Sequence, residues 1–187
     1  MAMTNEDIVR LTDQLETQEL ESPGGIATPQ TYGQLLAVYL LQNDLPNAKF
    51  LWKRIPVTIK STDAELTQIW AVGQKMWHRD FPGIYQCLNK EWSENMKNLM
   101  TALTEATKIR AFNLVSQAYS SISIDDFAAF VGVSTDNAIN VAVEHGWAAD
   151  DQNKVIIPKK PENTQCAVIP SEQHLSRLTD FVSFLEN

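Results

Sequence analysis

The residue types that most often carry out chemistry are few in this sequence and lie far apart. His78, His145 and His174 belong to no HExxH, HxH or paired Cys/His spacing that could hold zinc. Cys87 and Cys166 lie outside any CxxC pair, so a disulfide framework is not expected. A glycine-rich phosphate loop and a GxSxG nucleophile motif are also missing. We therefore expect no enzymatic activity, no bound metal and no cofactor.

An adjacent pair of carboxylates, Asp125 and Asp126, is the nearest approach to an acid pair. The pair opens a short apolar stretch, where carboxylates that cap a helix are commoner than catalytic ones. Gly132 can end this helix, and Ser134 can cap the next, which runs towards Gly146. Two helices joined by a short turn with glycine are the outline of a helix-turn-helix, a motif of DNA readers.

This helix-turn-helix lacks the charge that DNA binding requires. Residues 124–151 contain no Lys or Arg, and their six acidic residues are Asp125, Asp126, Asp136, Glu144, Asp150 and Asp151. Affinity for DNA comes mainly from basic side chains that meet phosphates, so the module is expected to bind protein and not nucleic acid. The formal net charge of −8 argues against nucleic acid and anionic membranes as general partners.

Two compact basic clusters, Lys53–Arg54 and Lys159–Lys160, are interpreted as solvated charge or partner contacts. The five tryptophans are expected to supply core area between helices. No apolar run approaches the roughly 18 residues that a membrane span needs, and the N-terminus has no signal-peptide core. An intracellular location is therefore expected.

The first two thirds of the chain are expected to form helices. Apolar residues recur at helical spacing over about 5–20 and again from Leu66 to Trp77, where Ser61 or Thr62 is the expected cap. A longer helix is expected over about 93–119. Repeats near 34 residues suggest a tetratricopeptide-like solenoid, although irregular helical hairpins would give the same pattern.

Short strands are expected after the helix-turn-helix. Residues 147–150 and 154–158 can pair around a polar turn, and residues 121–124 can add a third strand, which makes a winged helix. Val155, Ile156 and Ile157 lie in the second of these segments. An exposed strand edge there would invite pairing with another chain, whereas alternation into the domain's own core is the plain structural explanation.

The C-terminal segment, 171–187, is expected to be a helix with Ser171 as its cap, behind a proline-flanked linker. A helix of about 15 residues is marginal in water, so its apolar side must dock on its own domain or on a partner. We call that side the terminal seam; it consists of Leu175, Leu178, Phe181, Val182 and Leu185, and Phe184 widens it.

The predicted fold is mainly α: tetratricopeptide-like helical repeats followed by a winged-helix subdomain with a small β-hairpin and a C-terminal helix. The predicted parts are a helical-repeat part over 1–106, a winged-helix subdomain over 107–158, a linker over 159–170 and a terminal helix over 171–187.

Helical pairs that lead into an acidic winged helix are the pattern of the PCI-domain family. Four sequence segments make the resemblance specific: "GGIATPQTYGQLLAVYLLQNDLPNAKFLWKRIP", "WHRDFPGIY", "AFNLVSQAYSSISIDDFAAFVG" and "LTDFVSFLEN". In this order they resemble the subunit-eight family of the COP9 signalosome, the smallest PCI subunits of that complex. The resemblance extends from about Leu15 to Asn187.

The resemblance implies a non-catalytic scaffold in the cytoplasm and nucleus, within a complex that removes a ubiquitin-like modifier from cullins. The metalloprotease of that complex is another subunit. PCI subunits assemble through winged-helix edges and send C-terminal helices into a shared bundle. Carried over to this chain, the edge is centred on Val155, Ile156 and Ile157, and the terminal seam is the bundle face. A PCI subunit of the proteasome lid or of a translation initiation factor, or a winged-helix DNA-binding protein, remains as an alternative.

Overall fold

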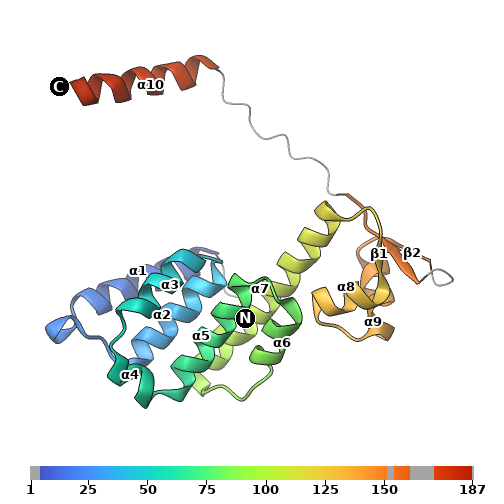
Figure 1. The fold of residues 1–187 in the computed structure, drawn as a ribbon, viewed down its shortest axis with the longest axis horizontal. Coiled ribbons are helices and arrows are strands. Elements are labelled where there is room, and N and C mark those ends of the chain that lie inside the picture. Colours follow the sequence, from blue (N-terminus) through green and yellow to red (C-terminus); the bar gives the residue numbers. More distant parts are fainter. Residues whose placement is uncertain (1–4, 151–153, 161–170, 187) are drawn as a thin grey trace.

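The computed structural model describes residues 5–150, 154–160 and 171–186. Most of the described chain is helical, as predicted, and a small antiparallel sheet follows the helices (Figure 1). The helices before the winged-helix part are α1 (Asn5–Leu20), α2 (Pro29–Leu41), α3 (Leu45–Arg54), α4 (Val57–Thr62), α5 (Ala64–Trp77), α6 (Phe81–Leu88) and α7 (Glu94–Ala118), with a short 3-10 turn at Pro23–Gly25.

Helix α2 is the centre of the helical body. It packs against α1, α3, α5 and α7, and nearly every residue from Tyr32 to Leu41 is buried. Leu35, Leu36 and Leu40 have no measurable exposure. Because burying a side chain of this size contributes about 1.5–3 kcal/mol, α2 contributes strongly to the stability of this half of the molecule.

Polar residues begin most helices of the body, and one of the predicted caps is wrong. The carboxylate of Asp63 accepts hydrogen bonds from the backbone N–H groups of Glu65 and Leu66, so it caps α5 in place of Ser61 or Thr62. Those two residues end the short helix α4, which was not expected from the sequence. Asp44 and Asp80 cap α3 and α6 in the same way.

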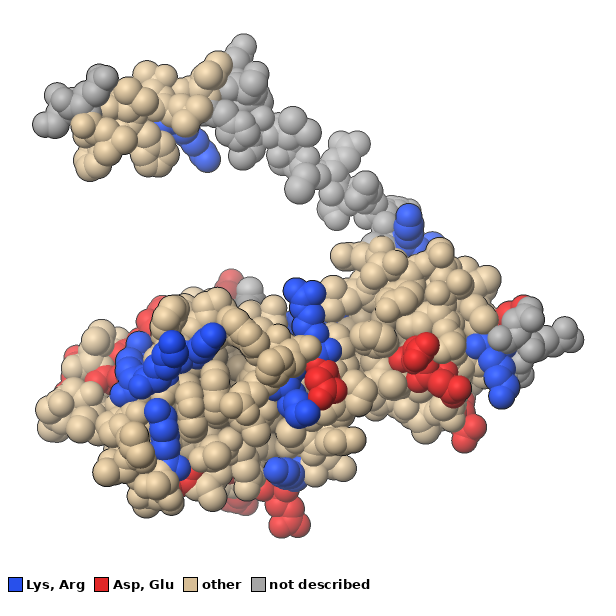
Figure 2. Space-filling model, viewed as in Figure 1, with Lys and Arg blue, Asp and Glu red and all other residues tan. Residues whose placement is uncertain are grey.

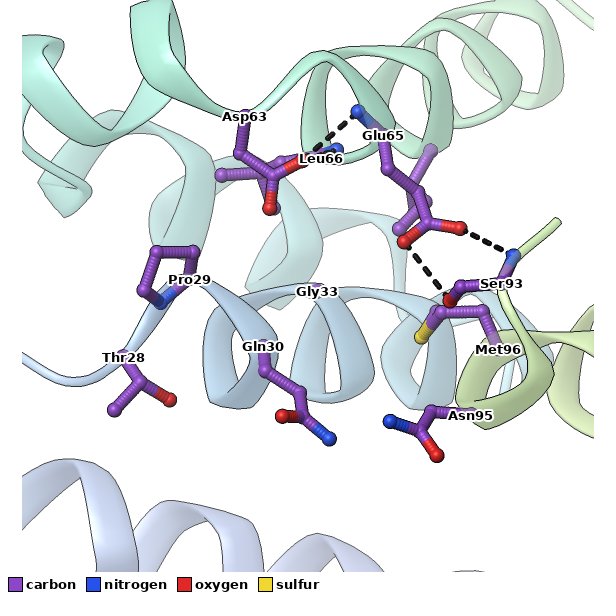
Figure 3. Close-up of a pocket in the computed structure, with 11 residues that line it drawn as sticks. Thr28, Pro29, Gln30, Gly33, Asp63, Glu65, Leu66, Ser93, Asn95 and Met96 are labelled. Carbon is purple, nitrogen blue, oxygen red and sulfur yellow. Dashed lines mark hydrogen bonds between the residues drawn. The ribbon is translucent and has the colours of Figure 1, made fainter.

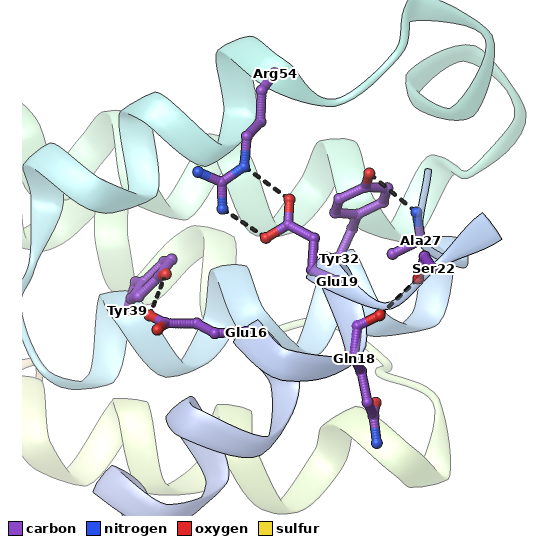
Figure 4. A network of polar contacts seen from close by, with 8 residues as sticks. All are labelled: Glu16, Gln18, Glu19, Ser22, Ala27, Tyr32, Tyr39 and Arg54. Atoms are coloured by element: carbon purple, nitrogen blue, oxygen red, sulfur yellow. Dashed lines mark hydrogen bonds and ion pairs between the residues drawn. The ribbon is translucent and has the colours of Figure 1, made fainter. Parts of the chain in front are cut away.

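A polar network fixes α1 to α2 and α3 (Figure 4). The guanidinium of Arg54 donates from Nε to Glu19 at 2.7 Å and also forms an ion pair with it, which raises the pKa of Arg54. The hydroxyl of Tyr39 donates to Glu16 at 2.7 Å; burial first, and then this bond, raises the pKa of Tyr39. Both contacts join residues more than 20 positions apart, so they hold α1 against α2 and α3.

The winged-helix part contains α8 (Ile124–Val131), α9 (Thr135–Glu144) and three strands, β1 (Ile122–Ser123), β2 (Ala148–Asp150) and β3 (Val155–Ile157). Phe127, Trp147 and Ile156 are in its core. The predicted strands are confirmed. The cap of α8 is Ser123, whose hydroxyl accepts from the backbone N–H of Asp126, so the expectation that the two aspartates cap this helix is wrong.

Helix α7 belongs to both halves of the molecule. Met96, Leu99 and Leu103 pack into the core of the helical body, whereas Val115 packs into the core of the winged helix. The predicted boundary between 106 and 107 therefore lies inside one continuous helix, and the division at that residue stays a prediction.

Helices α6 and α8 form a second connection between the halves. The hydroxyl of Tyr85 donates to the carbonyl of Phe130 at 3.0 Å, and burial raises the pKa of Tyr85 to about 12. Gly132 ends α8 with φ +71°, and a Cβ at this position would lie 2.6 Å from the ring of Tyr85. Glycine is needed here for its backbone conformation and for the close approach of the ring.

We expect Gly132→Ala to lower the free energy of unfolding by about 2–4 kcal/mol, because the strain of a left-handed alanine adds to displacement of the Tyr85 ring. Gly146→Ala is the matched control, since Gly146 has φ +74° and a Cβ added there would meet nothing within 4 Å. That variant should lose about 1–2 kcal/mol. Urea unfolding of both variants measures the difference, and equal losses would show that the contact with Tyr85 contributes nothing.

Candidate protein-interaction surfaces

The hollow where α2, α5 and α7 begin does not have the features of a catalytic site (Figure 3). It has a volume of about 440 Å³. Its carboxylates are engaged: Asp63 caps α5, and Glu65 accepts from the backbone N–H and the hydroxyl of Ser93 at 2.8 and 3.0 Å. The lining contains neither His nor Cys. Asp63, Glu65 and Ser93 thus hold the beginnings of α5 and α7 in place.

The histidines and the cysteine in the described part of the chain form no metal-binding group with acidic residues. His78 and His145 are C-caps of α5 and α9, as their positions before helix ends indicated. Cys87 is a free thiol, and Cys166 lies outside the described residues. Among the described residues, no group of three or more His, Cys, Asp or Glu is placed to hold a metal ion. None of the described helices has the length and hydropathy to cross a bilayer.

The expectation of an open strand edge at Val155, Ile156 and Ile157 is wrong. The strand order is β1-β3-β2, so β3 is the central strand and pairs on both sides. Ile156 has no exposure and is in the winged-helix core, Val155 is half-buried, and Ile157 is 49% exposed. Ile157 is therefore the member of this group whose side chain offers substantial area to a partner.

The outer strands of the described sheet are β1 and β2. Strand β1 has two residues, whereas β2 has three and carries Ala148 on its exposed side. A partner strand can add to a sheet at such an edge through backbone hydrogen bonds. The sequence indicated a third strand over 121–124 but not that it pairs with β3, which leaves β2 at the other edge.

The terminal seam lies on α10 (Ser171–Glu186), apart from the other described elements (Figure 1). Each of its five side chains is exposed, with exposed fractions from 52% to 80%, and Phe184 beside them is 79% exposed. Leu175, Leu178, Val182 and Leu185 follow one another at spacings of three, four and three, the spacing of a helix that packs against other helices. The seam and β3 are separate surfaces.

The winged-helix part carries the acidic surface that its sequence predicts (Figure 2). Asp125 and Asp126 are exposed on α8, and Asp136, Asn140 and Glu144 are exposed on α9. The side of α9 that would enter a DNA groove is thus anionic or neutral, which opposes the approach of phosphates.

Comparison with known proteins identifies the group to which this architecture belongs. A family model described as CSN8/PSMD8/EIF3K matches residues 26–167. The chain belongs to this family. Within the CSN8/PSMD8/EIF3K family, the chain is similar to proteins from several organisms that are named COP9 signalosome complex subunit 8.

The relative from Xenopus laevis is 56% identical over 100% of this chain and 96% of its own length. The relative from Arabidopsis thaliana is 36% identical over 83% and 79%, and that from Drosophila melanogaster is 31% identical over 95% and 96%. The resemblance to the subunit-eight family is confirmed by these relatives, because the family description alone also covers two other groups of proteins.

Proposed function

We propose that this chain is a non-catalytic scaffold subunit of the COP9 signalosome. In this role it supports cullin deneddylation, and so the regulation of cullin-RING ubiquitin ligases, through PCI-mediated protein–protein assembly in the cytoplasm and nucleus. The observation that carries the proposal is the exposed terminal seam on α10. The names of the full-length relatives indicate which assembly would bury it.

The terminal seam favours a helical partner over a flat surface. A helix of 16 residues is about 24 Å long, and the five side chains of the terminal seam lie on one side of it. Burying five large apolar side chains at about 1.5 kcal/mol or more each would stabilise docking substantially. The shared bundle that PCI subunits form is a site of this kind, and it accounts for a seam that would otherwise face water.

The winged helix supplies the second proposed contact, in a corrected position. A neighbouring PCI subunit would meet the outer edge of β2 and the exposed side chain of Ile157, rather than the paired backbone of β3. Ile156 would contribute by holding the sheet in place, because it is fully buried. The acidic side chains of α8 and α9 favour a partner with basic groups in this region.

Gentle purification of a tagged full-length chain, followed by mass spectrometry, tests the proposal. The expected result is recovery of the other signalosome subunits. The recovered complex should remove the ubiquitin-like modifier from cullins, and the purified chain alone should not. Recovery of the subunits of the proteasome lid or of a translation initiation factor in their place would assign the chain to one of the alternative assemblies.

A further inference from the structure

A basic surface lies on the helical body of this acidic protein. Residues 45–62 contain four basic residues and no acidic one, although the chain as a whole has 15 basic and 23 acidic residues. Figure 2 shows Lys and Arg side chains gathered over the α3–α4 side of the body. Arg54 pairs with Glu19, which leaves Lys49 and Lys53 on α3 and Lys60 on α4. We call these three lysines the basic surface.

Two of these lysines are held over tryptophan rings. The Nζ of Lys49 lies 4.3 Å from the ring centroid of Trp77, and the Nζ of Lys60 lies 4.9 Å from that of Trp52. Trp52 is itself stacked on Trp70, with 5.2 Å between centroids and 9° between planes. Such cation–π contacts restrict long side chains, so the ammonium groups are positioned before any partner arrives.

The basic surface has no counter-charge within the described parts of the chain. Neither Lys49, Lys53 nor Lys60 is in an ion pair there, whereas Lys75 pairs with Asp80. Large apolar side chains accompany the lysines: Phe50 is 59% exposed, and Trp77 is 48% exposed. Cations with exposed aromatic area are typical of an interface core, where charge gives orientation and rings give contact area.

We propose that the basic surface binds an acidic segment of a partner protein that carries at least one large apolar side chain. Carboxylates would meet the three ammonium groups, and the apolar side chain would cover Phe50 or Trp77. Nucleic acid fits less well, because Trp52 is already stacked on Trp70 and a net charge of −8 opposes a polyanion. The surface is distinct from the terminal seam and from the winged-helix sheet.

Fluorescence anisotropy with the full-length chain tests this proposal. The probe is a labelled peptide of about 12 residues, half of them Asp or Glu and two of them Phe, in about 50 mM salt. We expect saturable binding that weakens as salt rises, and at least about tenfold weaker binding by the K49E/K53E/K60E variant. K49Q/K53Q/K60Q, which keeps long polar side chains, should show a smaller loss in the same direction.

The matched control is K90E/K97E/K108E, which makes the same change in charge on lysines with exposed or half-buried positions elsewhere on the body. It should bind the peptide within about twofold of the unaltered chain. The proposal is overturned by absence of peptide binding, by an equal loss in the control, or by tighter binding of single-stranded DNA of similar length. Because the purified chain is used, the result is independent of its membership in any complex.

Discussion

Replacement of Leu178 and Leu185 by Asp should release the chain from its assembly while its own fold is preserved. Both leucines are in the terminal seam, with exposed fractions of 59% and 80%, so the change costs the free chain little. In a bundle, however, each Asp would replace apolar contact with a carboxylate removed from water. We expect affinity for the other subunits to fall at least about a hundredfold, measured by co-expression and size-exclusion chromatography.

The control for this variant places the same charges on the other side of α10. By helical spacing, Ser176 and Ser183 face away from the seam, so Ser176→Asp with Ser183→Asp should remain in the complex. Comigration of the seam variant with the assembly would contradict the bundle proposal. A loss of stability in the free seam variant would show that α10 folds back on its own domain.

Ile156→Asp should unfold the winged helix, whereas Ile157→Asp should leave it folded. Ile156 is fully buried on the central strand, in one core cluster with Phe127 and Trp147. A carboxylate there removes apolar burial and is left without a partner, so a loss of more than about 4 kcal/mol is expected. Ile157 is half exposed, and its substitution should cost less than about 1 kcal/mol.

Hydrogen exchange with mass spectrometry distinguishes the two variants locally. Amides of β1 and β3 should lose protection in Ile156→Asp and keep it in Ile157→Asp. Pairwise binding to the neighbouring PCI subunit should then weaken in the folded Ile157 variant. Equal protection in both variants would mean that Ile156 is not a core residue, and unaltered binding by the Ile157 variant would remove its side chain from the proposed interface.

Helices and strands could be predicted from the sequence because their signals are local. The apolar spacing of α5 and the left-handed Gly132 at the end of α8 both act within a few residues, whereas the linker predicted over 159–170 lies mostly outside the described residues. The terminal seam was visible for the same reason, since one helix defines it. Its exposure on α10 agrees with the expectation that this side of the helix docks elsewhere. The surface on which it docks stays a prediction.

What the sequence did not reveal depends on contacts between distant segments. Pairing of Ile122 with Ile156 makes β3 the central strand. No local sequence pattern indicates which strand of the hairpin residues 121–124 join. Likewise, Lys53 and Arg54 are neighbours in sequence but differ in structure, because Glu19 on α1 neutralises Arg54 alone. The absence of acidic residues from 45–62 was the available sign that this segment forms a basic surface.

The continuity of α7 has a mechanical consequence. At 25 residues it is about 37 Å long, and it enters the winged helix without an intervening loop, while the Tyr85–Phe130 bond braces the junction from the side. A partner subunit that binds the winged-helix part would therefore also set the orientation of the helical body. A force applied at one end of α7 would be transmitted to the other end with little bending of the helix.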